Sequence, residues 1–272
     1  MEKHAVAGLM RSIAGSGVRS AFYVLDLARV VDLYIRWRRA LPDLRAYYAV
    51  KCNPEQALLG ALAALGAGFD CASRRETEAV LALGVEPGSI VYANPCKPEA
   101  HIEYAARGPD NGDAKVDLGT KYGAHADEVL PLLRAAQRVG LGVAGVSFNI
   151  GSGGSRTDVY RGAIEAPRAA FDAAAALGMP PMRVLDVGGG FMAGGTAFDE
   201  AAAVIRDALA EHFGGLPCVE IICEPGRYFA ETSTAFTLAA RVIGKRTRGE
   251  VREYWINDGL YGLWLPQLRP HG

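Results

Sequence analysis

Long apolar runs are absent from this 272-residue sequence, because Gly, Pro or a charged residue interrupts each one well short of a membrane span. The first twenty residues lack the continuous apolar core of a secretory signal, and they contain Glu2, Lys3, Arg11 and Arg19. An excess of positive charge is absent too, since 29 Lys and Arg face 30 Asp and Glu. We therefore expect a cytoplasmic globular protein that binds neither nucleic acid nor membranes.

Cysteine is scarce in the sequence and shows no pairing pattern. The cysteines are odd in number and none belongs to a CxxC pair, so we expect neither disulfides nor a zinc site, and no other metal site. Most of them are expected to be small buried residues: Cys52, Cys71, Cys96, Cys218 and Cys223.

What the sequence does contain is an alternation of short apolar strands with Ala- and Leu-rich helices. Strands are expected at 45–51, 67–72, 89–93, 142–149, 182–187 and 218–223, and helices at 55–65, 75–83, 98–106, 158–177 and 198–212. This alternation predicts an α/β fold of parallel βαβ units. Glycines and charges at the strand ends indicate a (β/α)8 TIM-type barrel with its site at that edge. Only six strands are visible where a closed barrel needs eight.

Three parts are expected along the chain: an N-terminal arm over 1–20, the α/β barrel over 21–232, and a truncated beginning of a C-terminal β-domain over 233–272. Gly and Ser punctuate the arm, so we expect it to be loose with a short helix. Residues 21–26 are typical of a strand whose last residue, Asp26, caps the following helix.

Lys51 ends the first barrel strand and is followed directly by the turn signal Asn53-Pro54. At the rim of a core, partial desolvation lowers the pKa of a lysine, and its amine becomes a nucleophile toward carbonyls. The alternative is an ordinary solvated lysine. Asp70 ends the next strand, where it either pairs with Lys51 or caps the helix that starts near Ser73.

A glycine triplet, Gly188, Gly189 and Gly190, directly follows the strand expected at 182–187. Consecutive glycines leave backbone N–H groups bare, and these can surround an anionic group. The alternative is a turn that needs glycine for tight packing. In the loop after the preceding strand, Ser152 is placed to donate to the same anion.

The next strand ends in Glu224-Pro225-Gly226-Arg227. Gly226 frees an N–H group and Arg227 supplies a permanent positive charge for a phosphate. A surface pair of Glu224 with Arg227 is the alternative. Together with the glycine triplet, this turn predicts a composite phosphate site, which barrels place after their last two strands. A lysine amine, a phosphate site and an acid for a ring nitrogen suggest pyridoxal phosphate.

The sequence also resembles the eukaryotic ornithine decarboxylases, especially those of plants. The matching segments span nearly the whole chain: Tyr48–Asn53, Phe69–Ser73, Ala93–Lys97, Lys121–Ala124, Val146–Gly153, Leu185–Phe191, Glu224–Arg227 and Tyr254–Gly262. The resemblance implies a barrel of the alanine racemase type joined to a β-domain. It implies decarboxylation of L-ornithine to putrescine in polyamine biosynthesis, with pyridoxal 5′-phosphate as cofactor. It also implies a homodimer with a shared active site.

The resemblance assigns roles to the candidate residues. Lys51 becomes the lysine that bonds the cofactor, Asp70 its neighbour, and Glu224 the partner of the pyridine nitrogen. The phosphate-binding residues implied are Ser152, the triplet ending in Gly190, and the turn from Pro225 through Gly226 to Arg227.

Three departures from the family pattern accompany these matches. Asn149 stands where the family has a histidine that stacks on the cofactor ring, and an amide lacks that aromatic face. About one βαβ unit, of order 30 residues, is missing between Ala106 and Asn111. The rest of the β-domain, with its catalytic cysteine, does not follow Asn257. The alternatives are therefore an impaired relative that binds a partner as antizyme inhibitors do, a truncated gene product, or a decarboxylase of lysine or arginine.

Overall fold

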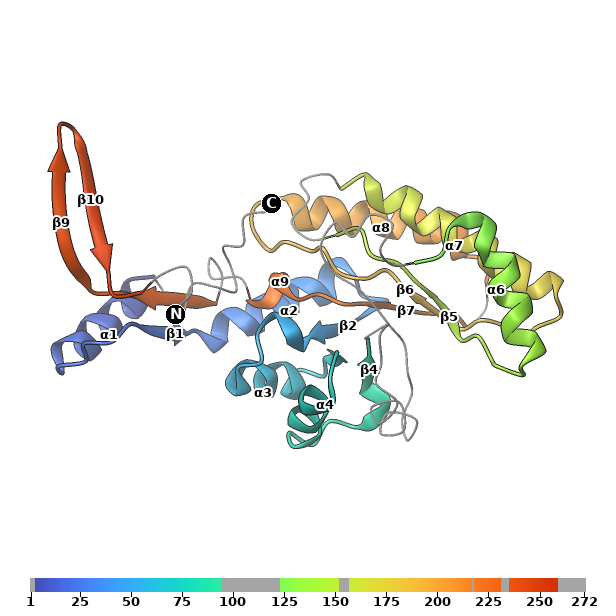
Figure 1. Ribbon diagram of the computed structural model, residues 1–272, viewed down its shortest axis with the longest axis horizontal. Helices are drawn as coiled ribbons and strands as arrows, with labels where there is room; N and C mark the ends of the chain where they lie inside the picture. The colour runs from blue at the N-terminus through green and yellow to red at the C-terminus, as the bar shows by residue number, and fades with distance from the viewer. Residues whose placement is uncertain (1–2, 94–122, 152–156, 217, 231–234, 259–272) are drawn as a thin grey trace.

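The computed structural model describes residues 3–93, 123–151, 157–216, 218–230 and 235–258 (Figure 1). Its helices are α1 (Lys3–Gly15), α2 (Leu27–Ala40), α3 (Gln56–Ala64), α4 (Arg74–Leu81), α6 (Ala126–Arg138), α7 (Val159–Ala176), α8 (Ala197–Phe213) and α9 (Arg227–Ala230). Its strands are β1 (Phe22–Leu25), β2 (Leu44–Ala49), β3 (Gly68–Cys71), β4 (Ile90–Tyr92), β5 (Gly145–Ser147), β6 (Val184–Asp186), β7 (Glu220–Cys223), β8 (Phe236–Ala239), β9 (Val242–Arg248) and β10 (Val251–Ile256). Within these ranges, no helix is both long and apolar enough to cross a membrane.

Six strands form one parallel sheet in the order β4-β3-β2-β7-β6-β5. The central strands β2 and β7 are distant in sequence but pair directly, with Ala46 beside Cys223. Each edge strand, β4 or β5, has one sheet neighbour within the described residues, and the chain between them includes 94–122, which is not described. The six predicted strands and their parallel arrangement are confirmed. The helix predicted at 98–106 lies outside the described residues.

The main hydrophobic core lies between the sheet and the helices that pack on it, chiefly α2, α3, α7 and α8. The apolar residues of α2 recur at intervals of three and four, so Val30, Leu33 and Trp37 face this core together. The Trp37 ring lies at the centre of an aromatic cluster, 4.8 Å from Phe191 and 5.2 Å from Tyr228 between ring centroids. Burial of such large rings is the main stabilising contribution at this position.

Side chains alternate between the two faces of the sheet, as the period of a strand requires. On the outer face, Tyr48 and Phe69 belong to the main core beneath the helices. On the inner face, Tyr47, Val91 and Ile222 form a second, smaller cluster. The sheet is therefore buried by helices on one side, and its other side is the inner face of a barrel.

Strands β1, β8, β9 and β10 lie outside this sheet. The strand predicted at 21–26 is present and Asp26 caps α2, accepting a hydrogen bond from the Ala28 N–H at 3.1 Å. Strand β1 pairs antiparallel with β8, and Val24 lies beside Thr237 in this pair. Strands β9 and β10 form a hairpin that projects from the rest of the molecule (Figure 1). The division of the chain at residues 20 and 232 stays a prediction.

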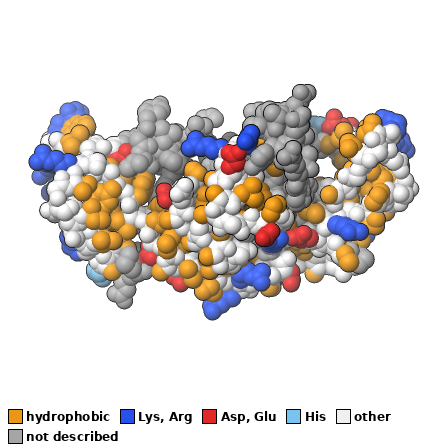
Figure 2. Space-filling view, turned by 90° about the horizontal axis from the view of Figure 1, so that it is seen from below, with side chains coloured by type: hydrophobic (Ala, Val, Ile, Leu, Met, Phe, Trp, Pro, Cys, Tyr) orange, Lys and Arg blue, Asp and Glu red, His pale blue; other side chains and the backbone are white. Residues whose placement is uncertain are grey.

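Two helices differ from the sequence-based expectation. The arm predicted to be loose with a short helix does contain a helix, but this helix, α1, is 13 residues long and forms most of the arm. Helix α6 was not predicted; it contains Pro131, a residue that ordinarily interrupts a helical pattern. On the face seen in Figure 2, hydrophobic side chains are interspersed with charged ones. The described cysteines Cys52, Cys71, Cys218 and Cys223 are free thiols, and Cys218 is exposed instead of buried.

Candidate cofactor site at the carboxyl edge of the sheet

The predicted site residues meet at the carboxyl edge of the parallel sheet. Asp70 lies beside Ala49 in the register of β3 and β2, and Asp186 lies beside Ile222 in that of β6 and β7. Residues in register on neighbouring strands project to the same side of a sheet. Since Ile222 and Tyr47 belong to the inner cluster, both carboxylates project from the inner face.

Lys51 does not end strand β2 itself but sits in a single 3-10 turn, Val50–Cys52, that follows it. Its Nζ lies 2.7 Å from Oδ2 of Asp70, whose side chain is fully buried, while 22% of the Lys51 side chain is exposed. The cap of helix α4 is Ser73, whose hydroxyl accepts a hydrogen bond from the Glu76 N–H at 3.3 Å. Of the two roles left open for Asp70, the structure supports the pairing with Lys51.

The surroundings of Lys51 raise the pKa of its amine, so the prediction of a lowered pKa was wrong. Burial by itself lowers this pKa, as expected, because it disfavours the charged form. The negative charges of Asp70 and Glu224 outweigh burial, and the hydrogen bond to Asp70 adds to their effect. The amine is therefore held as an ammonium next to a carboxylate that accepts its hydrogen bond. The sequence alone does not reveal how many acids converge on it.

Glu224 follows strand β7 and is only 2% exposed. Its N–H donates to the Gly188 carbonyl at 2.7 Å, and the Pro225 carbonyl accepts from the Ala49 N–H at 3.2 Å. These two hydrogen bonds attach the Glu224–Pro225 turn to the residues at the ends of β6 and β2. A surface pair between Glu224 and Arg227 is excluded by the burial of the glutamate. Arg227 is half-buried and begins α9, next to the buried Gly226.

The glycine triplet adopts a backbone that only glycine tolerates well. Gly188 and Gly190 have φ angles of +66° and +95°. A Cβ atom on Gly188 would lie 2.2 Å from the Phe148 carbonyl oxygen, and one on Gly189 would lie 2.9 Å from that of Glu224. Tight packing is therefore one reason for the triplet. Within the described residues, the N–H groups of Gly189 and Gly190 make no hydrogen bond, which leaves them available to an anion.

The N–H of Gly188 is not bare, because it donates to Oδ1 of Asp186 at 2.8 Å. Sequence reasoning did not assign a role to Asp186, although a lone acid in an apolar strand was a signal. The side chain is 1% exposed, and its Oδ2 accepts from the Ser147 hydroxyl at 3.0 Å. The pKa of Asp186 is raised to about 7, chiefly by burial and also by nearby Asp70, and the bonds from Gly188 and Ser147 and the charge of Lys51 limit this rise.

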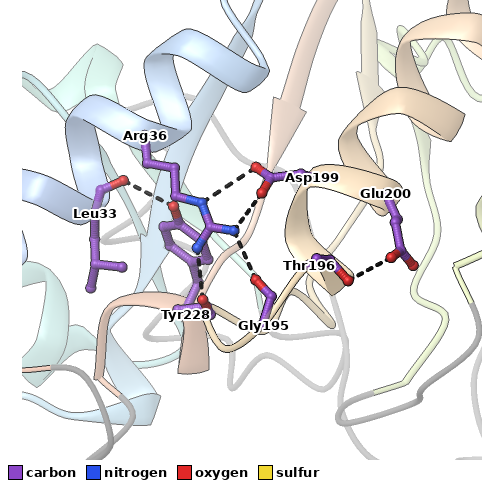
Figure 3. Close-up of polar contacts among 8 residues, drawn as sticks. Leu33, Arg36, Gly195, Thr196, Asp199, Glu200 and Tyr228 are labelled. Atoms are coloured by element: carbon purple, nitrogen blue, oxygen red, sulfur yellow. Dashed lines mark hydrogen bonds and ion pairs between the residues drawn. The ribbon is translucent and has the colours of Figure 1, made fainter.

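Two further side chains hold the triplet and the segment after it. Tyr160 of α7, which is buried, donates from its hydroxyl to the Gly189 carbonyl at 2.9 Å. Arg36 of α2 donates to the Ala193 carbonyl at 2.8 Å. It also donates to the Gly195 carbonyl at 3.1 Å (Figure 3). Its guanidinium also pairs with Asp199 at the start of α8 at 2.7 Å (Figure 3). The loop after β6 is thus bonded to α2 and α7, and through Arg36 it is connected to α8, whereas no local pattern in the sequence indicates these long-range bonds.

Asn149 lies in the loop after β5, close to the triplet. Its Oδ1 accepts from the Gly151 N–H at 2.8 Å, so the side chain shapes this turn. Its Nδ2 lies 4.0 Å from the position that a Cβ on Gly189 would take. Ser152, the predicted phosphate donor in the same loop, lies outside the described residues, so its placement stays a prediction.

The residues present fit pyridoxal phosphate. A loop without side chains offers the N–H groups of Gly189 and Gly190 to an anion. A buried carboxylate, Glu224, and a partly exposed amine, Lys51, lie near enough for the charge of one to act on the other. These are the donor types that hold the phosphate, ring nitrogen and aldehyde of this cofactor. In the described part of the chain, no group of three or more His, Cys, Asp or Glu is arranged to hold a metal ion.

A parallel α/β sheet with a paired lysine and a glycine cradle at its carboxyl edge defines a class of cofactor-binding barrel. The sequence profile of the family described as "Pyridoxal-dependent decarboxylase, pyridoxal binding domain" matches residues 27–111 and 108–231. The chain belongs to this family of pyridoxal-dependent decarboxylases. The two matched pieces meet where the sequence predicts that a βαβ unit is missing, between Ala106 and Asn111, and this supports that prediction.

Relatives with three different names resemble the chain. The chloroplastic ornithine decarboxylase of Nicotiana glutinosa is 51% identical over 93% of this chain and 65% of its own length. The crystal structure of the Paramecium bursaria Chlorella virus arginine decarboxylase bound to agmatine has a TM-score of 0.87 at 32% identity, covering 95% of this chain and 77% of that one. The lysine decarboxylase of Selenomonas ruminantium has a TM-score of 0.81 at 32% identity, covering 97% and 75%.

These similarities confirm the predicted family resemblance and the α/β barrel class. The chain spans just under two thirds of the length of the Nicotiana relative that it matches. The activity, substrate and partners of the whole relatives are therefore carried to this chain only as proposals.

Proposed function

We propose that this chain binds pyridoxal 5′-phosphate through Lys51 and decarboxylates L-ornithine to putrescine, a step of polyamine biosynthesis. The observation that carries the proposal is the 2.7 Å pair of Lys51 with buried Asp70, beside Glu224 and the glycine triplet, on one edge of the sheet. An isolated surface lysine would have no reason to be surrounded by buried acids, whose charges are costly unless they are paired.

Lys51 is the residue that bonds the aldehyde of the cofactor. An amine attacks a carbonyl only in its neutral form, and here neighbouring acids raise the pKa of the ammonium. Asp70 supports this role, because its Oδ2 is hydrogen-bonded to Nζ and is placed to receive the proton that Lys51 must lose.

Glu224 is the partner of the pyridine nitrogen. A buried carboxylate stabilises a proton on a ring nitrogen that it faces. When bound, pyridoxal phosphate supplies an electron sink for the carbanion left by loss of CO₂. The side chain of Glu224 serves this chemistry by holding the proton on the nitrogen.

Backbone N–H groups and the guanidinium of Arg227 hold the phosphate group of the cofactor. The N–H groups of Gly189 and Gly190 are available to it, and Arg227, after the turn Pro225-Gly226, supplies positive charge. Ser152 completes the proposed set. Gly188 contributes by conformation, because its own N–H is bonded to Asp186.

Ornithine is proposed over lysine and arginine because the 51% identical plant relative bears the ornithine name, whereas the arginine and lysine decarboxylases are 32% identical. Release of labelled CO₂ from each of the three amino acids, with the cofactor in excess, tests this choice. We expect ornithine to give the highest rate. A higher rate with lysine or arginine would overturn the assignment of substrate and leave the cofactor site intact.

A second candidate is a chain that binds the cofactor without turnover. One observation favours it: Asn149, which stands where the family has a histidine that stacks on the cofactor ring, uses its side-chain carbonyl in a turn within its own loop. Cofactor binding with no release of CO₂ from any of the three amino acids would select this candidate.

The test of the cofactor site is covalent capture. The protein is incubated with pyridoxal phosphate and reduced with borohydride, and its peptides are analysed by mass spectrometry. We expect one predominant adduct on the peptide that contains Lys51, lost in Lys51→Ala. The exposed lysine of the β9 strand provides the matched control, since Lys245→Ala should keep the adduct. An adduct that survives in Lys51→Ala would contradict the proposal.

Partners and location are part of the proposal. The homodimer predicted from the resemblance is checked by the mass of the protein in solution, and an antizyme-like regulator would be a further partner. We propose a cytoplasmic location, although the Nicotiana relative is named chloroplastic. Fluorescence of a tagged full-length chain in its own cells would decide between the two compartments.

A further inference from the structure

Asp186 is a buried acid for which the proposed chemistry has no use. It is the last residue of β6, is 1% exposed, and points to the same face of the sheet as Asp70 and Ile222. Burial of a carboxylate is unfavourable unless hydrogen bonds compensate for lost water. A small apolar side chain at this position would avoid that cost, so the hydrogen bonds of Asp186 require an explanation.

Those bonds join two loops. Oδ1 accepts from the Gly188 N–H at 2.8 Å, and Oδ2 accepts from the Ser147 hydroxyl at 3.0 Å. The main-chain carbonyl of Asp186 also accepts from the Phe148 N–H at 3.1 Å. The loops are in direct contact here, because a Cβ on Gly188 would lie 2.2 Å from the Phe148 carbonyl oxygen. Asp186 thus ties the start of the glycine triplet to the end of β5.

We propose that Asp186 is a positioning residue for the cofactor phosphate, fixing the glycine triplet against the loop after β5 through Gly188 and Ser147. The inference rests on the proposed function, because the phosphate is the ligand that the triplet would hold. The carboxylate acts on the ligand through the backbone, because its hydrogen bond fixes Gly188, the residue directly before the N–H groups of Gly189 and Gly190.

A positioning role and a general structural role predict different results. If Asp186 only stabilises the fold, its loss weakens every ligand of the site to the same extent. If it positions the phosphate cradle, its loss acts on the phosphate ester and spares a ligand without phosphate. Pyridoxal, which has the ring and aldehyde but lacks the phosphate, makes this comparison possible.

The experiment measures binding of pyridoxal phosphate and of pyridoxal by equilibrium dialysis. Asp186→Leu is nearly isosteric but accepts no hydrogen bond, so we expect its affinity for pyridoxal phosphate to fall about tenfold or more. Its affinity for pyridoxal should change less than about threefold. Asp186→Asn keeps an acceptor for Gly188 and a polar partner for Ser147, and it should restore most of the preference for the phosphate ester.

Ser147→Ala removes only one of the two bonds, at an exposed position, and serves if Asp186→Leu does not fold. We expect it to lower the preference for pyridoxal phosphate by about threefold. An unchanged preference in Asp186→Leu, or in Ser147→Ala when the leucine variant is unfolded, would overturn the inference. Wild-type protein that binds the two ligands equally would instead contradict the proposed phosphate site itself.

Discussion

The carboxyl edge of the sheet and the β9–β10 hairpin contain similar side chains in opposite surroundings. The first region holds the pair of Lys51 with Asp70, and the second holds the pair of Arg246 with Glu253. Their N–O distances are alike, 2.7 Å and 2.5 Å, but Asp70 is fully buried whereas both members of the hairpin pair are at least one third exposed. Water and ions screen the second pair, so similar geometry does not mean similar energy.

Aromatic residues show the same contrast. Trp37 is completely buried among other rings, whereas Trp255 on β10 is 46% exposed. The hairpin also exposes most of its other large apolar side chains: Val242, Ile243, Val251, Tyr254 and Ile256. Burial, more than residue type or contact distance, therefore decides which side chains of this chain stabilise the fold and which groups have altered chemistry.

Truncation of the two tryptophans should give the largest difference between the regions. Trp37→Ala removes a ring from the aromatic cluster and its hydrogen bond to the Leu44 carbonyl, so we expect a loss of about 4 kcal/mol in unfolding free energy. Trp255→Ala should cost about 1 kcal/mol or less, since its ring meets water and one guanidinium, that of Arg246. Urea denaturation monitored by circular dichroism gives both values. Equal losses of unfolding free energy would show that burial does not set the contribution of these two rings.

Removal of one acid from each ion pair should give the second largest difference in unfolding free energy between the two regions. Asp70→Ala leaves the ammonium of Lys51 partly buried without its hydrogen-bonded carboxylate, and we expect a loss of about 3 kcal/mol. Glu253→Ala should cost about 0.5 kcal/mol, as is usual for an exposed pair. The same denaturation experiment measures both, and high salt should reduce only the hairpin effect. A loss below about 1 kcal/mol in Asp70→Ala would mean that the pair contributes little despite its burial.

Two glycines with positive φ provide a third matched pair. Gly188, at +66°, has the Phe148 carbonyl where a Cβ would go, whereas Gly249, at +56° in the hairpin turn, has open space around that position. Alanine at either position adopts a disfavoured backbone, at a cost of about 1 kcal/mol or slightly more. Gly188→Ala must also separate two loops, so we expect at least about 2 kcal/mol in total and weaker binding of pyridoxal phosphate. A Gly188→Ala protein as stable as Gly249→Ala would show that the loops after β5 and β6 can move apart at little cost in stability.

Local sequence patterns predicted the sheet well because they follow directly from periodicity. Strand spacing, the cap at Asp26 and the glycine triplet at a strand end all depend on residues close together in the chain. The six parallel strands and the meeting of Lys51 with Asp70 followed from them. Helix α6 was missed because Pro131 obscures its pattern.

Interactions between residues that are distant in the sequence could not be predicted from local patterns. The raised pKa of Lys51 depends on Asp70 and Glu224 acting together from different strands. The bonds of Arg36 and Tyr160 to the loop after β6 connect segments 29 or more residues apart, with no local signal. Asp186 was visible as an acid in an apolar strand, but its two partners become apparent only when β5 and β6 are placed side by side.

The pH dependence of stability provides another test of the role of burial, because one buried carboxylate, Asp186, should dominate it. Asp186 has an ordinary pKa of 3.8 when unfolded and a pKa of about 7 in the folded protein. Between these values the folded state binds more protons than the unfolded state, so stability falls as pH rises from about 4 to about 7. Asp186 contributes up to about 1.4 kcal/mol per pH unit to this fall, and the electrostatic effects of Asp70, Lys51 and Cys223 act on it from neighbouring elements.

Asp186→Asn cannot titrate, and its urea-unfolding free energy should therefore fall less steeply between pH 5 and pH 6 than that of the wild type, by about 1 kcal/mol. The exposed hairpin turn offers a control for the loss of one negative charge: Glu250→Gln should keep the wild-type slope. Parallel slopes in wild type and Asp186→Asn would mean that hydrogen bonds from Gly188 and Ser147 keep the carboxylate ionised despite its burial. In that outcome, hydrogen bonding would outweigh desolvation at this strand end, and burial alone would no longer explain the difference between the two regions.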